Sequence, residues 1–139
     1  MVACLGRRFA SVRVLLPLSW PMPNKPDLLQ RRLVLFGASA SELSRRLPRD
    51  VAGQNVARQL VRAATAPAAN YAEAREAEST TDYIHRMKIC LKELRETAVW
   101  ISTAQLLSGG RLNADALEKE CNELISIFVV CLKKARTHA

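Results

Sequence analysis

The sequence predicts an all-α protein, an antiparallel up-down-up-down four-helix bundle. Three observations lead to this fold class. Four segments carry apolar residues in steps of three and four, which places each set on one face of a helix. Short polar turns separate these segments, and no segment shows the alternation typical of a strand. Short connections make consecutive helices antiparallel neighbours, and 139 residues suit one domain of this kind.

The first helix is expected to begin near Asp27, directly after Pro26, and to end at Pro48, because proline suits a helix start and cannot continue a helix. Gly37 lies inside it and costs about 1 kcal/mol relative to alanine. A close approach to a neighbouring helix is one reason to keep glycine there. The apolar face is Leu29, Leu33, Phe36, Ala40, Leu43 and Leu47.

The second helix is expected to follow Asp50, whose side chain suits an N-cap. Pro67 lies within this segment and removes one backbone hydrogen bond, which predicts a kink. Alternatively, the helix ends at Ala66 and a new one begins at Pro67; we favour the single, kinked helix. Its apolar face consists mainly of small residues, which predicts close packing: Gly53, Val56, Leu60, Ala63, Pro67 and Asn70 or Tyr71.

The third helix is expected to start after Ser79, because a hydroxyl residue followed three positions later by Asp82 resembles a capping box. No glycine or proline interrupts it before Gly109, so it has about 29 residues. Its expected apolar face is Ile84, Met87, Leu91, Leu94, Ala98 and Ile101.

Asn113 should cap the fourth helix. That helix carries Leu117, Cys121, Leu124, Phe128 and Cys131, and ends in Lys133, Lys134 and Arg136.

Residues 1–26 differ in composition from the rest of the chain. They contain four prolines and no acidic residue, which predicts a poorly ordered N-terminal extension, while 27–137 form the bundle. No apolar run approaches the roughly 20 residues needed to span a membrane. We therefore expect a cytoplasmic protein without a membrane partner.

Basic residues outnumber acidic ones by 21 to 13, and the excess is uneven. Residues 22–62 hold eight basic and three acidic residues, whereas 63–130 hold seven and ten. In the expected topology the basic residues gather at the two ends of the bundle and suggest a phosphate-binding face. The alternative is solvated charge that keeps the protein soluble. The candidate nucleic-acid-binding residues are Arg31, Arg32, Arg45, Arg46, Arg49, Arg58, Lys133, Lys134 and Arg136.

Catalytic and metal-binding patterns do not stand out. The four cysteines (Cys4, Cys90, Cys121 and Cys131) form no closely spaced pair, so we expect reduced thiols and no metal. His85 has no evident nucleophile or acid partner, and no glycine-rich phosphate loop is present. We expect a protein that is not an enzyme and has no cofactor.

One stretch carries a family resemblance. Residues 58–97 read RQLVRAATAPAANYAEAREAESTTDYIHRMKICLKELRET. This stretch resembles the four-helix bundle proteins named after intervening sequences of 23S ribosomal RNA, the S23 family. Many members have Gly after Asn-x-Ala-Glu, where this chain has Ala74. The matching positions are Arg62-Ala63-Ala64, Pro67, Asn70, Ala72, Glu73, Ser79, Tyr83-Ile84 and Glu93-Leu94-Arg95-Glu96-Thr97.

The resemblance implies a bundle assembled into a ring, commonly a homopentamer, with an unsettled function. Members are encoded within inserts of 23S ribosomal RNA genes or as free-standing genes. A similar bundle is the accessory protein of diversity-generating retroelements and works with a reverse transcriptase.

Two interpretations of the motif residues Arg62, Asn70 and Glu73 are open. They form either a contact surface between subunits or toward RNA, or a buried hydrogen-bond network that fixes the kink. We favour the structural one, because buried polar groups need partners.

Our leading functional hypothesis is a non-enzymatic oligomer that binds structured RNA or DNA through its basic ends. The alternative is a protein-binding scaffold, or the accessory protein of a reverse-transcriptase retroelement, without direct contact to nucleic acid.

Overall fold

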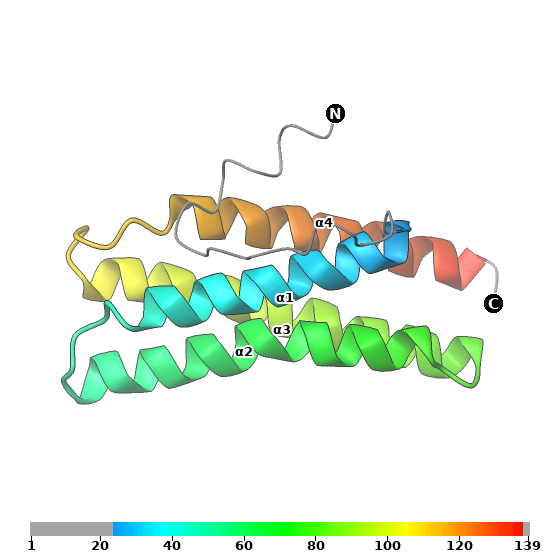
Figure 1. Cartoon of the computed structure of the whole chain (residues 1–139), viewed down its shortest axis with the longest axis horizontal. Helices are drawn as coiled ribbons and strands as arrows, with labels where there is room; N and C mark the ends of the chain where they lie inside the picture. The colour runs from blue at the N-terminus through cyan, green and yellow to red at the C-terminus, as the bar shows by residue number, and fades with distance from the viewer. Residues whose placement is uncertain (1–23, 138–139) are drawn as a thin grey trace, which may run out of the picture.

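The computed structural model describes residues 24–137, and within this range all regular secondary structure is helical (Figure 1). The helices are α1 (Lys25–Ser44), α2 (Val51–Arg75), α3 (Thr80–Leu107) and α4 (Asp115–Thr137). This confirms the all-helical fold class with four helices. The expectation of a poorly ordered extension falls on residues outside the described range, apart from 24–26, where Asn24 caps α1 and Lys25 and Pro26 begin it.

A side-chain oxygen satisfies a backbone N–H group at the start of every helix. Asn24, Asp50 and Ser79 each accept from the backbone nitrogen three residues later, at 2.9, 2.8 and 3.1 Å. Asn113 accepts from the backbone nitrogen two residues later at 3.1 Å. Such caps use N–H groups that have no partner within a first helical turn. The three predicted caps are present, and Asn24 places the start of α1 two residues before Asp27.

Each helix packs against two neighbours: α1 on α2, α2 on α3, α3 on α4, and α4 on α1 (Figure 1). The side chain of Asp27, near the start of α1, bonds Arg75 at the end of α2. The Cys121 thiol, early in α4, donates to the carbonyl of Leu94, midway along α3. The α1–α2 and α3–α4 turns therefore share one end of the bundle, and the α2–α3 turn lies at the other.

Small residues permit close approach where the sequence suggested it. A Cβ atom added to Gly37 would lie 3.2 Å from the carbonyl oxygen of Ala64 in α2. A Cβ atom on Gly53 would lie 1.8 Å from the carbonyl oxygen of Pro48, so glycine is required there. Pro67 lies buried inside α2, which is one continuous helix, as expected.

The buried faces of α1, α2 and α4 follow the predicted apolar positions closely. In α4, Leu132 is buried where Cys131 was expected, and Cys131 is half-buried. For α3, the buried face is rotated about the helix axis relative to the predicted one. Its six buried residues are Met87, Cys90, Leu94, Thr97, Ile101 and Ala104, whereas the predicted Ile84, Leu91 and Ala98 pack at the edge of the core. Because α3 contacts both α2 and α4, its buried face is centred between two neighbours.

None of the helices in the described part of the chain is both long and apolar enough to cross a membrane.

Candidate functional site

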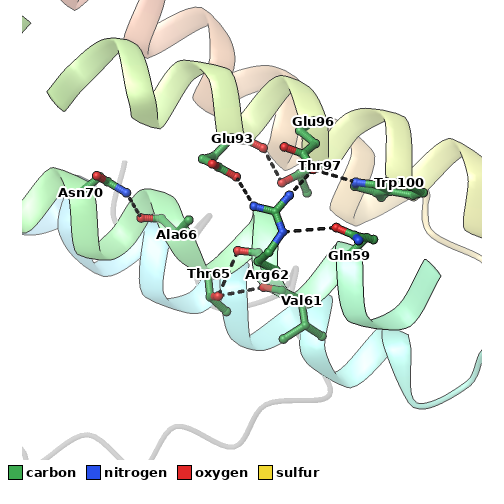
Figure 2. A network of polar contacts seen from close by, with 10 residues as sticks. All are labelled: Gln59, Val61, Arg62, Thr65, Ala66, Asn70, Glu93, Glu96, Thr97 and Trp100. Atoms are coloured by element: carbon green, nitrogen blue, oxygen red, sulfur yellow. Dashed lines mark hydrogen bonds and ion pairs between the residues drawn. The ribbon is translucent and has the colours of Figure 1, made fainter. Parts of the chain in front are cut away.

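The family-motif residue Arg62 bridges α2 and α3 (Figure 2). Its guanidinium lies 3.5 Å from the carboxylate of Glu93 and donates a hydrogen bond to Glu96. Its Nε–H group donates to the side chain of Gln59 at 3.2 Å. The Arg62 side chain is 52% exposed, whereas that of Glu93 is 15% exposed. The motif thus forms a half-exposed ionic link between two helices, rather than a buried network.

Trp100 extends this network along α3 (Figure 2). Its indole N–H donates to Glu96 Oε1 at 3.2 Å. This hydrogen bond, followed by those from Arg62, lowers the pKa of Glu96, because each donor stabilises the ionised carboxylate. Trp100 therefore lies at the core edge and positions an acidic partner of Arg62.

Two further motif residues, Asn70 and Glu73, have partners other than Arg62. Asn70 donates from Nδ2 to the carbonyl of Ala66 at 3.0 Å, one turn back within α2. Glu73 accepts a hydrogen bond from Arg86 of α3 and forms a second link between these helices. Arg62, Glu93 and Glu96 therefore act as one group, while Asn70 and Glu73 lie elsewhere on α2.

Two other arginines also hold helices together. Arg32 of α1 donates to both carboxylate oxygens of Glu120 in α4 at 2.8 Å, and to Glu123 at 3.0 Å. The hydrogen bond to Glu120 is the largest cause of the raised pKa of Arg32. Arg75 pairs with Asp27 at 2.7 Å. Arg32, a candidate nucleic-acid-binding residue, is thus engaged in an ion pair between helices.

The arginines of the α1–α2 turn have a different environment. We call Arg45, Arg46 and Arg49 the basic turn. All three are exposed, and within residues 24–137 none of their side chains bonds to another helix. Arg45 pairs with Glu42, one turn back in α1, at 3.3 Å, and its own side chain is 77% exposed. Arg58 is exposed further along α2. The structure therefore brings four of the predicted residues to one end of the bundle.

The other predicted basic residues lie at the opposite end, where α1 starts and α4 ends (Figure 1). Arg31 is half-buried there. The basic residues of the C-terminal tail are exposed: Lys133, Lys134 and Arg136. The α2–α3 turn shares this end and contributes Glu73, Glu76, Glu78 and Asp82. Positive and negative charges are therefore interspersed at this end.

The titratable groups in the core do not suit catalysis at neutral pH. Burial raises the pKa of Cys90 and of Cys121 to about 12, so both thiols stay protonated. Burial also raises the pKa of the half-buried Cys131. His85 is exposed on α3. Among residues 24–137, no three His, Cys, Asp or Glu side chains are grouped to hold a metal ion. Cys4 lies outside the described residues.

Sequence reasoning missed a groove of about 600 Å³ between α1 and α4. Some of its residues lie beside the predicted apolar faces, such as Leu28, Leu35 and Ile127. Their apolar character is the only signal in the sequence, because surface leucines also occur singly without any role.

None of the curated proteins matches the chain. Among solved structures, a crystal structure of a protein with unknown function from the S23 ribosomal protein family of Bacteroides thetaiotaomicron VPI-5482 matches with a TM-score of 0.67. The two sequences are 23% identical, and the match covers 79% of this chain and 99% of that chain. This likeness supports the fold. The family model described as 23S rRNA-intervening sequence protein matches residues 31–129, well over half of the chain. The chain therefore belongs to the 23S rRNA-intervening sequence protein family.

Proposed function

We propose that this protein is a non-enzymatic, homo-oligomeric up-down-up-down bundle that binds structured nucleic acid through its basic turn. One observation carries the proposal. Residues 45–58 hold four arginines and one acidic residue, and the arginine side chains are exposed and make no bond to another helix in the described part of the chain. The planar guanidinium of arginine matches phosphate oxygens through paired hydrogen bonds.

The family name supports the choice of RNA, because it refers to intervening sequences of 23S ribosomal RNA. The basic turn contains no aromatic residue that could stack on an unpaired base. Recognition would therefore rest on phosphate contacts and on the shape of a folded RNA rather than on base edges. Within residues 24–137 only Asp50 in this segment offsets the four positive charges, and it is engaged as the cap of α2.

The test measures affinity for a 23S-derived hairpin RNA and an unrelated structured RNA across a salt series. The variant is R45Q/R46Q/R49Q. The matched control is K88Q/K92Q/R95Q, which removes three exposed charges from α3 and so changes net charge equally. Each lost phosphate contact should reduce the slope of log affinity against log salt by about 1. The proposal fails if the wild type does not bind at low salt, or if both triple variants bind equally.

Oligomerisation is the second part of the proposal. Family resemblance implies a ring, commonly a pentamer, and α3 offers a surface for it. Val99 and Leu106 are 60% and 83% exposed and lie seven residues apart on one face of that helix. The reduced thiols Cys90 and Cys121 suit a cytoplasmic location. Sedimentation at micromolar concentration should show an oligomer that Leu106→Asp weakens; a wild-type monomer would refute this part.

A protein-binding scaffold is the second candidate function. The exposed apolar side chains of Val34 on α1 and of Val129 and Val130 on α4 favour it. The partner would be another protein, such as a reverse transcriptase if the gene lies in a retroelement. Cellular function that survives R45Q/R46Q/R49Q would favour the scaffold over the nucleic-acid proposal.

A further inference from the structure

The groove between α1 and α4 has the size and walls of a small-molecule site. Its volume of about 600 Å³ falls within the range of about 300–1,000 Å³ typical of ligand pockets. Leu28 and Leu35 from α1 and Ile127 from α4 provide apolar walls, and Tyr71 and Tyr83 line it from α2 and α3. All four helices thus contribute to one pocket.

The shape of the groove is fixed by the core beneath it. Tyr71 is 6% exposed, and its ring meets Phe128 edge-on at a centroid distance of 5.8 Å. Phe128 itself is completely buried. Because both rings are held by core packing, an apolar ligand would enter a preformed site, and little binding free energy would be spent on rearranging the protein.

Among the described residues, the charged side chains that line the groove are all basic: Lys25, Arg31 and Arg32. Arg32 is held by Glu120 and Glu123, as described above. Within residues 24–137, neither Lys25 nor Arg31 pairs with a carboxylate. An apolar pocket beside two such cations is complementary to a ligand with an apolar body and an anionic head.

The chain preceding Asn24 is a less suitable occupant on grounds of charge. Residues 1–21 carry Arg7, Arg8 and Arg13 and no acidic residue. Placing them at this groove would bring like charges together. We infer that the groove binds a single-chain alkyl carboxylate, with its tail along Leu28 and Ile127 and its carboxylate beside Lys25 and Arg31.

The test is calorimetric titration of the full chain with decanoate and with decanol, which share a tail but differ in charge. Decanoate should bind saturably, one molecule per chain and about tenfold tighter than decanol. Arg31→Gln should weaken decanoate binding about fivefold and leave decanol binding unchanged. The matched control Arg95→Gln, on the exposed face of α3, should alter neither.

Blocking the groove gives the second readout. Leu28→Trp and Ile127→Trp should each abolish binding of both ligands while the helical circular dichroism stays that of the wild type. In a Cys4→Ser protein, bound decanoate should also slow alkylation of Cys131, which lines the groove, whereas Cys90 and Cys121 are buried.

Three results would overturn the inference. They are non-saturable binding, binding unaffected by both tryptophan variants, and binding that appears only after residues 1–23 are removed. The last would show that the chain itself occupies the groove. The R45Q/R46Q/R49Q variant should still bind decanoate, so this inference and the nucleic-acid proposal fail separately.

Discussion

The α2–α3 interface and the α1–α4 interface of this bundle are built differently. The first is closely packed along its length and carries two ionic links, from Arg62 and from Arg86. The second has the sparsest packing of the four interfaces, an ionic link from Arg32 to Glu120 and Glu123, and an open groove. Small buried residues allow α2 to approach its neighbours, whereas larger side chains at the edges of α1 and α4 leave space between them.

The arginines of the bundle fall into two groups, those that bridge helices and those of the basic turn. Arg32, Arg62, Arg75 and Arg86 bridge helices, and their loss should reduce stability. The arginines of the basic turn bridge nothing in the described range, and their loss should reduce binding. Stability and binding measurements on matched variants can therefore separate these roles.

The largest difference in the free energy of unfolding is expected between a substitution in the core and one at the groove. Leu94→Ala in α3, where the side chain is completely buried, should lower the free energy of unfolding by about 3 kcal/mol. Ile127→Ala, at the half-open groove, should cost about 1 kcal/mol because less apolar surface is lost from the core. Urea denaturation of both variants measures the difference. Equal costs would show that the groove is as closely packed as the core.

Loss of the Arg32 link between α1 and α4 should have the next largest effect on stability. Arg32→Gln leaves Glu120, whose side chain is only 14% exposed, without its bidentate partner. We expect a loss of about 1–2 kcal/mol in the free energy of unfolding. Amide hydrogen exchange should accelerate in α1 and α4 more than in α2 and α3. Uniform acceleration in all four helices would contradict a locally weak interface.

A weaker effect is expected for Arg62→Gln, because its side chain is half exposed and α2 and α3 keep the link from Arg86. The expected loss is about 0.5–1 kcal/mol, as for exposed ion pairs. A loss exceeding that of Arg32→Gln, measured in the same urea series, would reverse the ranking of the two interfaces.

Trp100→Phe tests the polar network through pH. The hydrogen bond from Trp100 is the largest cause of the lowered pKa of Glu96, so this variant should raise that pKa toward its ordinary value. A carboxyl group with a lowered folded-state pKa stabilises the protein above its unfolded pKa and loses that contribution as pH falls through the folded pKa. The electrostatic part of the variant's defect should therefore disappear in acid. An NMR titration of Glu96 that shows no change would exclude this link.

The smallest stability effect is expected for R45Q/R46Q/R49Q. Exposed side chains without inter-helix bonds usually alter the free energy of unfolding by less than about 0.5 kcal/mol. Thermal unfolding beside the wild type measures it. A loss as large as that of Arg32→Gln would show that the basic turn has a structural role.

Much of the fold was accessible from the sequence because helix periodicity and capping are local. The caps at Asp50, Ser79 and Asn113 and the continuous helix through Pro67 could be predicted from neighbouring residues. The rotation of α3 could not, because it depends on how two neighbours share one helix. The pairing of Arg32 with Glu120 joins residues 88 positions apart, and no local pattern indicates it. The groove likewise depends on the spacing of two helices from opposite ends of the chain.

The most direct test of the central claim compares RNA affinity of the two triple variants at one low salt concentration. R45Q/R46Q/R49Q and K88Q/K92Q/R95Q carry the same net charge and should both keep the wild-type fold. We predict that the first binds structured RNA at least about tenfold more weakly than the wild type, and that the second binds within about threefold of it. Equal weakening in both variants would contradict the claim, because binding would then follow net charge rather than the basic turn.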